Sequence, residues 1–171
     1  MIQKAIQFAA VKHSGQLRKW TNSPYITHPL SVMEKVKNYL PTHVPKEVKE
    51  NMMMAAVLHD TVEDTDATIP EILHIFGETV ANYVWYLSDT PKFAGNRAHR
   101  KALDAERLAL APNEVKIIKL FDFQDNAPSI KENDPRFYQQ FLLEKHNLFE
   151  KMNLESVSFY GDENISRFVL V

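Results

Sequence analysis

The sequence predicts an all-α fold, and three observations support this. Apolar residues recur at helical spacing through most of the chain, and no stretch alternates apolar and polar residues clearly enough to indicate a sheet. The chain has only 4 glycines, so few tight turns are expected. Its 171 residues contain no Gly/Ser- or Pro-rich linker, which is typical of one domain. We therefore expect a single domain over residues 1–171 with about eight helices.

The N-terminal part of the chain divides into helices at its prolines. In the predicted helix over residues 2–13, apolar side chains recur at i, i+3, i+4 and i+7, which places them on one face. A loop follows, and Pro29 can occupy the first turn of a second helix over residues 30–40, because its missing N–H costs little there. Pro41 ends that helix.

The middle of the chain has further start and stop signals. Pro45 can open a third helix, predicted over residues 46–64. Thr68 is the predicted cap of a short helix over residues 69–76, because its hydroxyl can accept a backbone N–H. Gly77 is predicted to end that helix.

The C-terminal half continues the helical pattern. Residues 88–96 contain proline and glycine and predict a loop. Residues 154–171 have mixed periodicity and predict a C-terminal tail, formed by a short helix or an extended segment. The remaining helices are predicted over residues 78–88, 97–110, 114–126 and 135–152.

Composition excludes several classes of function. The net charge is −2, which gives no electrostatic reason to expect nucleic acid or an anionic membrane as a partner. Cysteine is absent, so neither disulfides nor thiolate metal sites are available. No apolar run approaches the length of about 18 residues that spans a membrane, and the amphipathic N-terminus does not have the layout of a signal peptide. We expect a cytoplasmic protein.

The segment AAVLHDTVEDTDAT, residues 55–68, brings an apolar run directly into a cluster of ionisable groups. On a helix, His59 and Glu63 share one face, and so do Asp60 and Asp64. Burying such groups without a partner costs on the order of several kcal/mol or shifts their pKa values. A divalent metal would compensate them, because carboxylates and neutral imidazoles are both common metal ligands.

Two further residues are candidates to complete a metal site. His28 lies just before a predicted helix, and Asp122 interrupts an otherwise apolar helix. Simpler interpretations exist for these residues. Adjacent His-Asp pairs such as His59-Asp60 are common by chance, and Asp122 could point to solvent. The other histidines are expected to be surface or packing residues: His13, His43, His74, His99 and His146.

The order and spacing of these residues resemble the HD-domain metal-dependent phosphohydrolases. The resemblance is strongest to small, single-domain alarmone hydrolases of the RelA/SpoT type. The motifs AVKHSGQLRK, SPYITHPLSV, AAVLHDTVEDTDAT and KIIKLFDFQDN carry it, and together they cover roughly residues 5–126. The resemblance implies an HD-domain helical bundle. Because the chain as given has no synthetase domain, we do not expect it to synthesise the alarmone.

The resemblance also implies roles for individual residues. The metal, expected to be Mn²⁺, would be held by His28, His59, Asp60 and Asp122. Glu63 and Asp64 match the pair that positions or deprotonates the attacking water. Among the basic residues at positions 97, 100 and 101, Lys101 is our preferred phosphate contact. The implied substrate-binding residues are Arg18, Lys19, Tyr25, Lys101 and Asn126.

The implied activity is removal of the 3′-pyrophosphate of ppGpp or pppGpp, leaving GDP or GTP and pyrophosphate. The chain departs from the family at KLFDFQDN, where Phe123 replaces a cation and Asp125 replaces an aromatic residue or histidine. Because that segment lies near the nucleotide in the family, another phosphorylated nucleotide such as NADPH is an alternative substrate. A non-catalytic nucleotide-binding module is a third alternative. The intact set of metal-ligand positions favours an enzyme over this third alternative.

Overall fold

A computed structural model describes residues 1–153, and the predicted tail over residues 154–171 lies outside the described residues. Within the described part, the chain forms nine α-helices and one short 3₁₀-helix and contains no strand. The prediction of an all-α fold is therefore confirmed. The chain divides into two compact units, Met1–Ser88 and Asp89–Val171, here called unit 1 and unit 2. No helix in the described range is long and apolar enough to cross a membrane.

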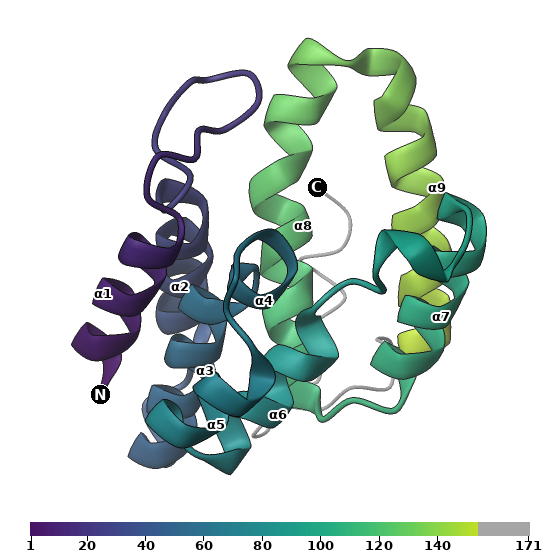
Figure 1. Ribbon diagram of the computed structural model, residues 1–171. Helices are drawn as coiled ribbons and strands as arrows, with labels where there is room; N and C mark the ends of the chain where they lie inside the picture. Colours follow the sequence, from purple (N-terminus) through teal and green to yellow (C-terminus); the bar gives the residue numbers. More distant parts are fainter. Residues whose placement is uncertain (154–171) are drawn as a thin grey trace. The chain divides into compact units, whose positions relative to one another are not determined.

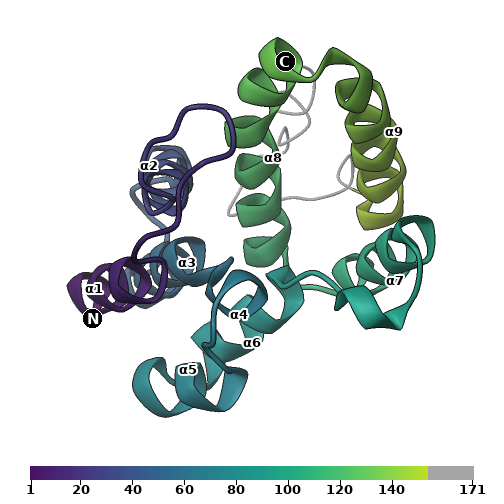
Figure 2. The ribbon, with the colours of Figure 1, turned by 45° about the horizontal axis from the view of Figure 1, so that its top comes forward.

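Unit 1 is built around its third helix. α3 contacts α1, α2 and α6, and α6 in turn contacts α5 (Figures 1 and 2). Every residue of α3 from Met54 to Leu58 is buried, because a helix that is apolar on all sides belongs in a core. The helices are α1 (Ile2–Lys12), α2 (Thr27–Tyr39), α3 (Lys46–Leu58), α4 (Thr61–Asp64), α5 (Ile69–Phe76) and α6 (Glu78–Leu87).

The predicted single helix over residues 46–64 is wrong, because the chain ends α3 at Leu58 and begins the separate one-turn helix α4 at Thr61. Two polar side chains form hydrogen bonds with backbone carbonyl oxygens in the last turn of α3. His59 Nδ1 lies 2.8 Å from the carbonyl oxygen of Ala56, and the Thr61 hydroxyl donates to the carbonyl oxygen of Leu58 over 2.7 Å. Such side-chain bonds compete with the helical backbone ladder, which explains the break.

The second helix begins earlier than predicted, at Thr27, so His28 lies in its first turn. The Thr27 hydroxyl donates to the carbonyl oxygen of Pro24 over 2.8 Å, and the His28 N–H donates to the carbonyl oxygen of Tyr25 over 2.9 Å. These bonds tighten the entry to the helix, and Pro29 fits there as predicted.

The predicted boundaries of α5 are confirmed at both ends. The Thr68 hydroxyl accepts the N–H of Glu71 over 3.3 Å and caps the first turn. Gly77 follows the last turn with φ of 88°, a conformation that glycine adopts without steric cost.

Unit 2 consists of helices packed on α9. α9 contacts both α7 and α8, and Figures 1 and 2 show α8 and α9 as neighbours joined by a short connection. Side-chain caps define two starts: Asn96 accepts the N–H of His99, and Asp134 accepts the N–H of Phe137. The elements are η1 (Lys92–Ala94), α7 (Arg97–Ala109), α8 (Asn113–Asn133) and α9 (Pro135–Met152).

α8 is longer than the predicted helix over residues 114–126, because it continues through Pro128 to Asn133. The side chain of Pro128 is exposed, and that of Ile130 is buried, so the last turns keep an apolar anchor. The Ser129 hydroxyl donates to the carbonyl oxygen of Asn126 over 3.1 Å. Packing and side-chain bonding therefore outweigh the backbone bond that proline removes.

Candidate active site

His59 closes α3 with its imidazole fixed in one orientation. The side chain is buried, and its Nδ1 donates to the carbonyl oxygen of Ala56 over 2.8 Å. Because a carbonyl can only accept, this bond places a proton on Nδ1, so the neutral imidazole has its lone pair on Nε2. Nε2 lies 3.0 Å from Oδ2 of Asp60. This is the arrangement of a histidine held ready to bind a metal.

His28 approaches the same carboxylate oxygen from the first turn of α2. Its buried Nε2 lies 3.5 Å from Oδ2 of Asp60, and the His28 and His59 rings have centroids 5.2 Å apart. A cation bound between two imidazole nitrogens and a carboxylate so close together would offset their facing lone pairs. One carboxylate with two histidine nitrogens suits Mn²⁺, Fe²⁺ or Zn²⁺. The structure thus brings together three of the four predicted metal ligands within unit 1.

Tyr25 contacts this cluster through its hydroxyl, which donates to Oδ2 of Asp60 over 2.7 Å. Hydrogen bonds of this kind orient a ligating carboxylate. The prediction assigned Tyr25 to the substrate, and no observation tests that contact. Its position in the structure indicates a role in holding Asp60.

α4 carries the two predicted water-handling residues, Glu63 and Asp64. The pKa of Asp64 is raised from its ordinary value, because partial burial removes hydration from the carboxylate and because the negative charge of Asp60 is near. A carboxylate with a raised pKa is a stronger proton acceptor than an ordinary aspartate.

Arg18 and Lys19 lie on a tight hairpin between α1 and α2. The Arg18 N–H donates to the carbonyl oxygen of Ser23, and the Tyr25 N–H donates to that of Gln16, each over 2.9 Å. The ammonium of Lys19 lies 4.6 Å from the centre of the Trp20 ring, a cation–π distance. The two predicted phosphate contacts are therefore neighbours on a single structured loop of unit 1.

In unit 2, Asp122 does not point to solvent. The residue is only 7% exposed, and Lys119 Nζ lies 3.0 Å from its Oδ2. Asn126 donates from its amide to Oδ1 over 2.8 Å. The simpler interpretation of Asp122 as a solvent-facing residue is thus wrong. Lys119 is a partner that the sequence reasoning missed, although its i, i+3 spacing to Asp122 offered a signal.

Lys101, also in unit 2, lies in an acidic environment. Its ammonium forms an ion pair with Asp89 and lies 3.5 Å from Oδ2 of Asp104. Of the neighbouring basic residues, Arg97 forms two hydrogen bonds to Glu144, at 2.7 and 2.6 Å. The phosphate contact of Lys101 therefore stays a prediction.

Phe123 has a clear packing role. Its ring centroid lies 5.3 Å from that of Phe141 and 5.5 Å from that of Phe149, both on α9. These distances are typical of stabilising aromatic pairs. Phe123, one of the positions that depart from the family, therefore packs against α9.

His13 and Gln16 are the main residues of this region that the sequence reasoning missed. His13 was expected at the surface or in packing, and it is 3% exposed. Its Nδ1 lies 2.8 Å from Oε1 of Gln16, and its ring centroid lies 4.8 Å from that of Tyr25. Histidine at the end of an amphipathic helix gives no signal of such contacts, because they depend on the hairpin that follows.

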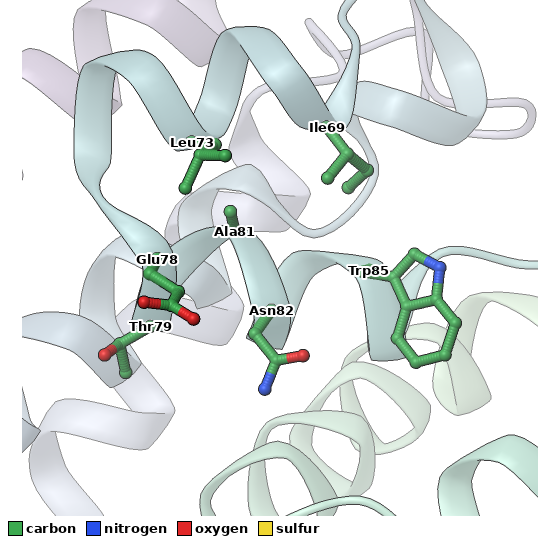
Figure 3. Close-up of a pocket in the computed structure, with 7 residues that line it drawn as sticks. All are labelled: Ile69, Leu73, Glu78, Thr79, Ala81, Asn82 and Trp85. Atoms are coloured by element: carbon green, nitrogen blue, oxygen red, sulfur yellow. The ribbon is translucent and has the colours of Figure 1, made fainter.

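A separate pocket of about 450 Å³ lies between α5 and α6 in unit 1. Figure 3 shows Ile69 and Leu73 of α5 together with Trp85 of α6. Among residues 1–153, no lysine or arginine lines this pocket, and none of the predicted site residues does. The lining does not suit a phosphorylated nucleotide, because the only charged group in it is a carboxylate. The lining residues are Ile69, Leu73, Glu78, Thr79, Ala81, Asn82 and Trp85.

Comparison with known proteins identifies relatives across most of the chain. The family described as HD domain matches residues 5–152. The guanosine-3′,5′-bis(diphosphate) 3′-pyrophosphohydrolase MESH1 of Drosophila melanogaster is 30% identical over 158 residues, covering 90% of this chain and 83% of the relative. The Xenopus tropicalis MESH1 protein is 33% identical over 147 residues, covering 85% and 78%. A longer Aquifex aeolicus enzyme of the same activity is 39% identical over 132 residues, which form 18% of its length.

Solved structures agree with these relatives. The chain matches the structure of a metazoan SpoT orthologue that hydrolyses ppGpp with a TM-score of 0.75 and 29% identity, covering 88% of this chain and 84% of that one. A Listeria monocytogenes structure matches with a TM-score of 0.63 and 25% identity. The chain therefore belongs to the HD domain family and is a small homologue of the SpoT-type ppGpp hydrolases.

Proposed function

We propose that this protein is a metal-dependent hydrolase that removes the 3′-pyrophosphate of ppGpp and pppGpp, leaving GDP or GTP and pyrophosphate. One observation carries the proposal: Nε2 of His28 and Nε2 of His59 converge on Oδ2 of Asp60 at 3.5 and 3.0 Å. Relatives that hydrolyse ppGpp match the chain around this cluster. We also propose that residues 1–171 act as one HD domain, because the family match includes residues of both units.

His28, His59 and Asp60 would hold a divalent metal, and on the sequence resemblance Asp122 is the fourth ligand. A metal at these residues would act as a Lewis acid and lower the pKa of a bound water. We propose Mn²⁺ as the metal, since carboxylates and imidazoles together suit it.

Glu63 and Asp64 have the proposed role of accepting the proton of the attacking water. The water oxygen forms a bond to the phosphorus attached to O3′, and the bond between that phosphorus and O3′ breaks. The leaving O3′ takes up a proton, which Glu63 or Asp64 can return. The raised pKa of Asp64 supports proton transfer at this residue.

The proposed substrate contacts follow chemical type. Arg18 suits bidentate contact with phosphate oxygens, and Lys19 and Lys101 offer point charges. Asn126 is the proposed residue at the nucleotide end of the site. A nucleotide substrate also supports the cytoplasmic location that we propose.

The test is product analysis of ppGpp, pppGpp and NADPH, each incubated with purified protein in Mn²⁺ or in EDTA. We expect Mn²⁺-dependent release of pyrophosphate and GDP from ppGpp. Release of phosphate from NADPH without hydrolysis of ppGpp would support the proposed metal-dependent chemistry but show that the substrate is NADPH. A metal-loaded protein that binds these nucleotides and hydrolyses none of them would contradict the enzyme and indicate a binding module.

A further inference from the structure

We propose that His13, Gln16 and Tyr25 together position the reacting residues of unit 1, and we call these three residues the hairpin base. This inference rests on the proposed function, because it assigns a task toward Asp60 and α4. None of the three is proposed as a metal ligand. Each acts through contacts that a sequence pattern does not reveal.

The first branch of the hairpin base runs from His13 to α4. The Gln16 side-chain amide donates from Nε2 to the carbonyl oxygen of Asp64 over 2.7 Å. This contact fixes the Gln16 amide, so Oε1 faces Nδ1 of His13 at 2.8 Å and must accept the Nδ1 proton. His13 therefore orients Gln16, and Gln16 holds the last residue of α4.

α4 needs such support, because a helix of four residues has almost no stability of its own. The last carbonyl groups of a helix lack partners within it. Gln16 supplies a partner to the carbonyl of Asp64, the residue next to Glu63. Loss of this bond would let α4 fray at the residues proposed to handle the proton.

The second branch runs from His13 to Asp60. The His13 and Tyr25 rings lie 4.8 Å apart at an angle of 35°, which restricts the Tyr25 ring. The Tyr25 hydroxyl then donates to Oδ2 of Asp60 over 2.7 Å. His13 thus supports both the metal-binding carboxylate and the proton-accepting helix.

The two branches pass through Gln16 and Tyr25, which form the two ends of one hairpin. The Tyr25 N–H donates to the carbonyl oxygen of Gln16, which closes the loop that carries Arg18 and Lys19. Any displacement of this loop would therefore reach Asp60 and Asp64 through the hairpin base. The loop therefore carries the charges of Arg18 and Lys19 and is also connected to the reacting residues by hydrogen bonds.

The first test is Gln16→Leu, which keeps the volume of the side chain and removes its amide. We expect kcat to fall about tenfold with KM for ppGpp changed less than about twofold, since a positioning group acts mainly on the chemical step. Amide hydrogen exchange of residues 61–66 should accelerate in metal-free protein. Gln3→Leu, at an exposed position of α1, is the matched control and should change neither quantity.

His13→Phe tests whether the contacts form one chain. Phenylalanine keeps a ring against Tyr25 and removes the donor to Gln16. The double variant His13→Phe/Gln16→Leu should have nearly the kcat of Gln16→Leu alone, because both changes break the same connection. Fully additive losses would contradict a shared path to α4.

Tyr25→Phe separates the two branches. It should weaken Mn²⁺ binding to EDTA-treated protein about tenfold, as loss of an outer hydrogen bond to a ligand does. Gln16→Leu should leave this affinity unchanged. Titration calorimetry measures the affinity, and circular dichroism verifies that each variant is folded.

Two results would overturn the proposal: unchanged exchange of residues 61–66 in Gln16→Leu, or unchanged Mn²⁺ affinity in Tyr25→Phe. If the wild-type protein does not hydrolyse ppGpp, the proposed function fails separately. Exchange and metal affinity still decide the hairpin base in that case, because neither measurement depends on turnover.

Discussion

At the scale of single residues, Asp60 is the point where the contacts of unit 1 meet. Its Oδ2 receives the Tyr25 hydroxyl and faces both histidine nitrogens. An amide in its place would carry no charge to offset a bound cation. Removal of this one charge should therefore affect the metal before it affects the fold.

We expect Asp60→Asn to lose metal binding and turnover, with the helical content of the protein unchanged. Metal analysis of purified protein, product analysis with ppGpp and circular dichroism measure the three quantities. Asp66→Asn is a matched control, because Asp66 is exposed and bonded to Lys12. Normal turnover in Asp60→Asn would exclude the assigned site.

Glu63 has a different proposed role from Asp60: it accepts the proton of the attacking water and does not bind the metal. Glu63→Gln should keep metal and substrate binding and lose about 10²- to 10⁴-fold in kcat, the usual contribution of a general base. Single-turnover kinetics and metal analysis test this pair of outcomes. Loss of metal from the variant would instead make Glu63 a ligand.

The predicted cluster of His28, His59 and Asp60 rested on the resemblance to the HD-domain family, because spacing alone does not select His28. The structure brings these three residues together. His13 and Gln16 could not be predicted in this way. Their contacts depend on a hairpin that returns the chain to α4, and neither helical periodicity nor local motif chemistry specifies that return.

At the scale of elements, the predicted helical segments are helical, and the differences are one interruption and several shifted boundaries. The helix over residues 46–64 is interrupted, because His59 and Thr61 bond to carbonyls that a continuous helix would use. The helix over residues 114–126 extends to Asn133, because a buried Ile130 holds the turns beyond Pro128. Side-chain bonding and burial are decided in three dimensions, so local signals do not determine these boundaries.

The contact between α8 and α9 gives a prediction about Phe123. Phe123→Ala should lower the free energy of unfolding by about 2–3 kcal/mol, because two aromatic contacts are lost at a partly buried position. Phe123→Leu keeps apolar packing and should cost about 1 kcal/mol. Urea denaturation measures both values. A changed preference between ppGpp and NADPH in Phe123→Leu would indicate that Phe123 contacts the substrate.

Asp104 links α7 to the segment before it and makes the stability of unit 2 depend on pH. Thr90 donates its N–H and its hydroxyl to Oδ1 of Asp104 at 2.8 and 2.6 Å, and Arg107 donates at 2.8 Å. Burial opposes ionisation, but these bonds and the charges of Lys101 and Arg107 outweigh it and lower the pKa of Asp104.

A folded-state pKa below the unfolded value stabilises the protein above about pH 4, and the stabilisation is lost as pH falls through the folded pKa. Asp104→Asn should therefore reduce the free energy of unfolding at pH 7 by about 1–3 kcal/mol and flatten its decline in acid. Urea denaturation of metal-free protein from pH 3 to 7 measures the profile. Glu106→Gln, at an exposed position, is the control, and equal slopes in all three proteins would contradict the assignment.

At the scale of the whole molecule, metal binding and folding are linked by mass action. A ligand that binds only the folded state at a hundred times its dissociation constant adds about 2.7 kcal/mol of stability. For a chain of 171 residues this corresponds to a rise of roughly 5–10 °C in Tm. We expect this rise when Mn²⁺ replaces EDTA.

Differential scanning calorimetry measures the rise, and Asp60→Asn should remove it. Mg²⁺ at the same concentration should give a smaller shift, because imidazole nitrogens are poor ligands for it. Equal melting temperatures in Mn²⁺ and EDTA would contradict a resident metal in the wild-type protein.

The fixed imidazole of His59 also provides an intrinsic NMR signal that reports metal binding. The Nδ1 proton is held by the carbonyl oxygen of Ala56 in a side chain that is 1% exposed, so exchange of this proton with water should be slow. A slowly exchanging imidazole proton gives a separate downfield line in a proton NMR spectrum. Occupation of Nε2 on the opposite side of the ring would move that line, so metal loading could be followed without a label and without substrate.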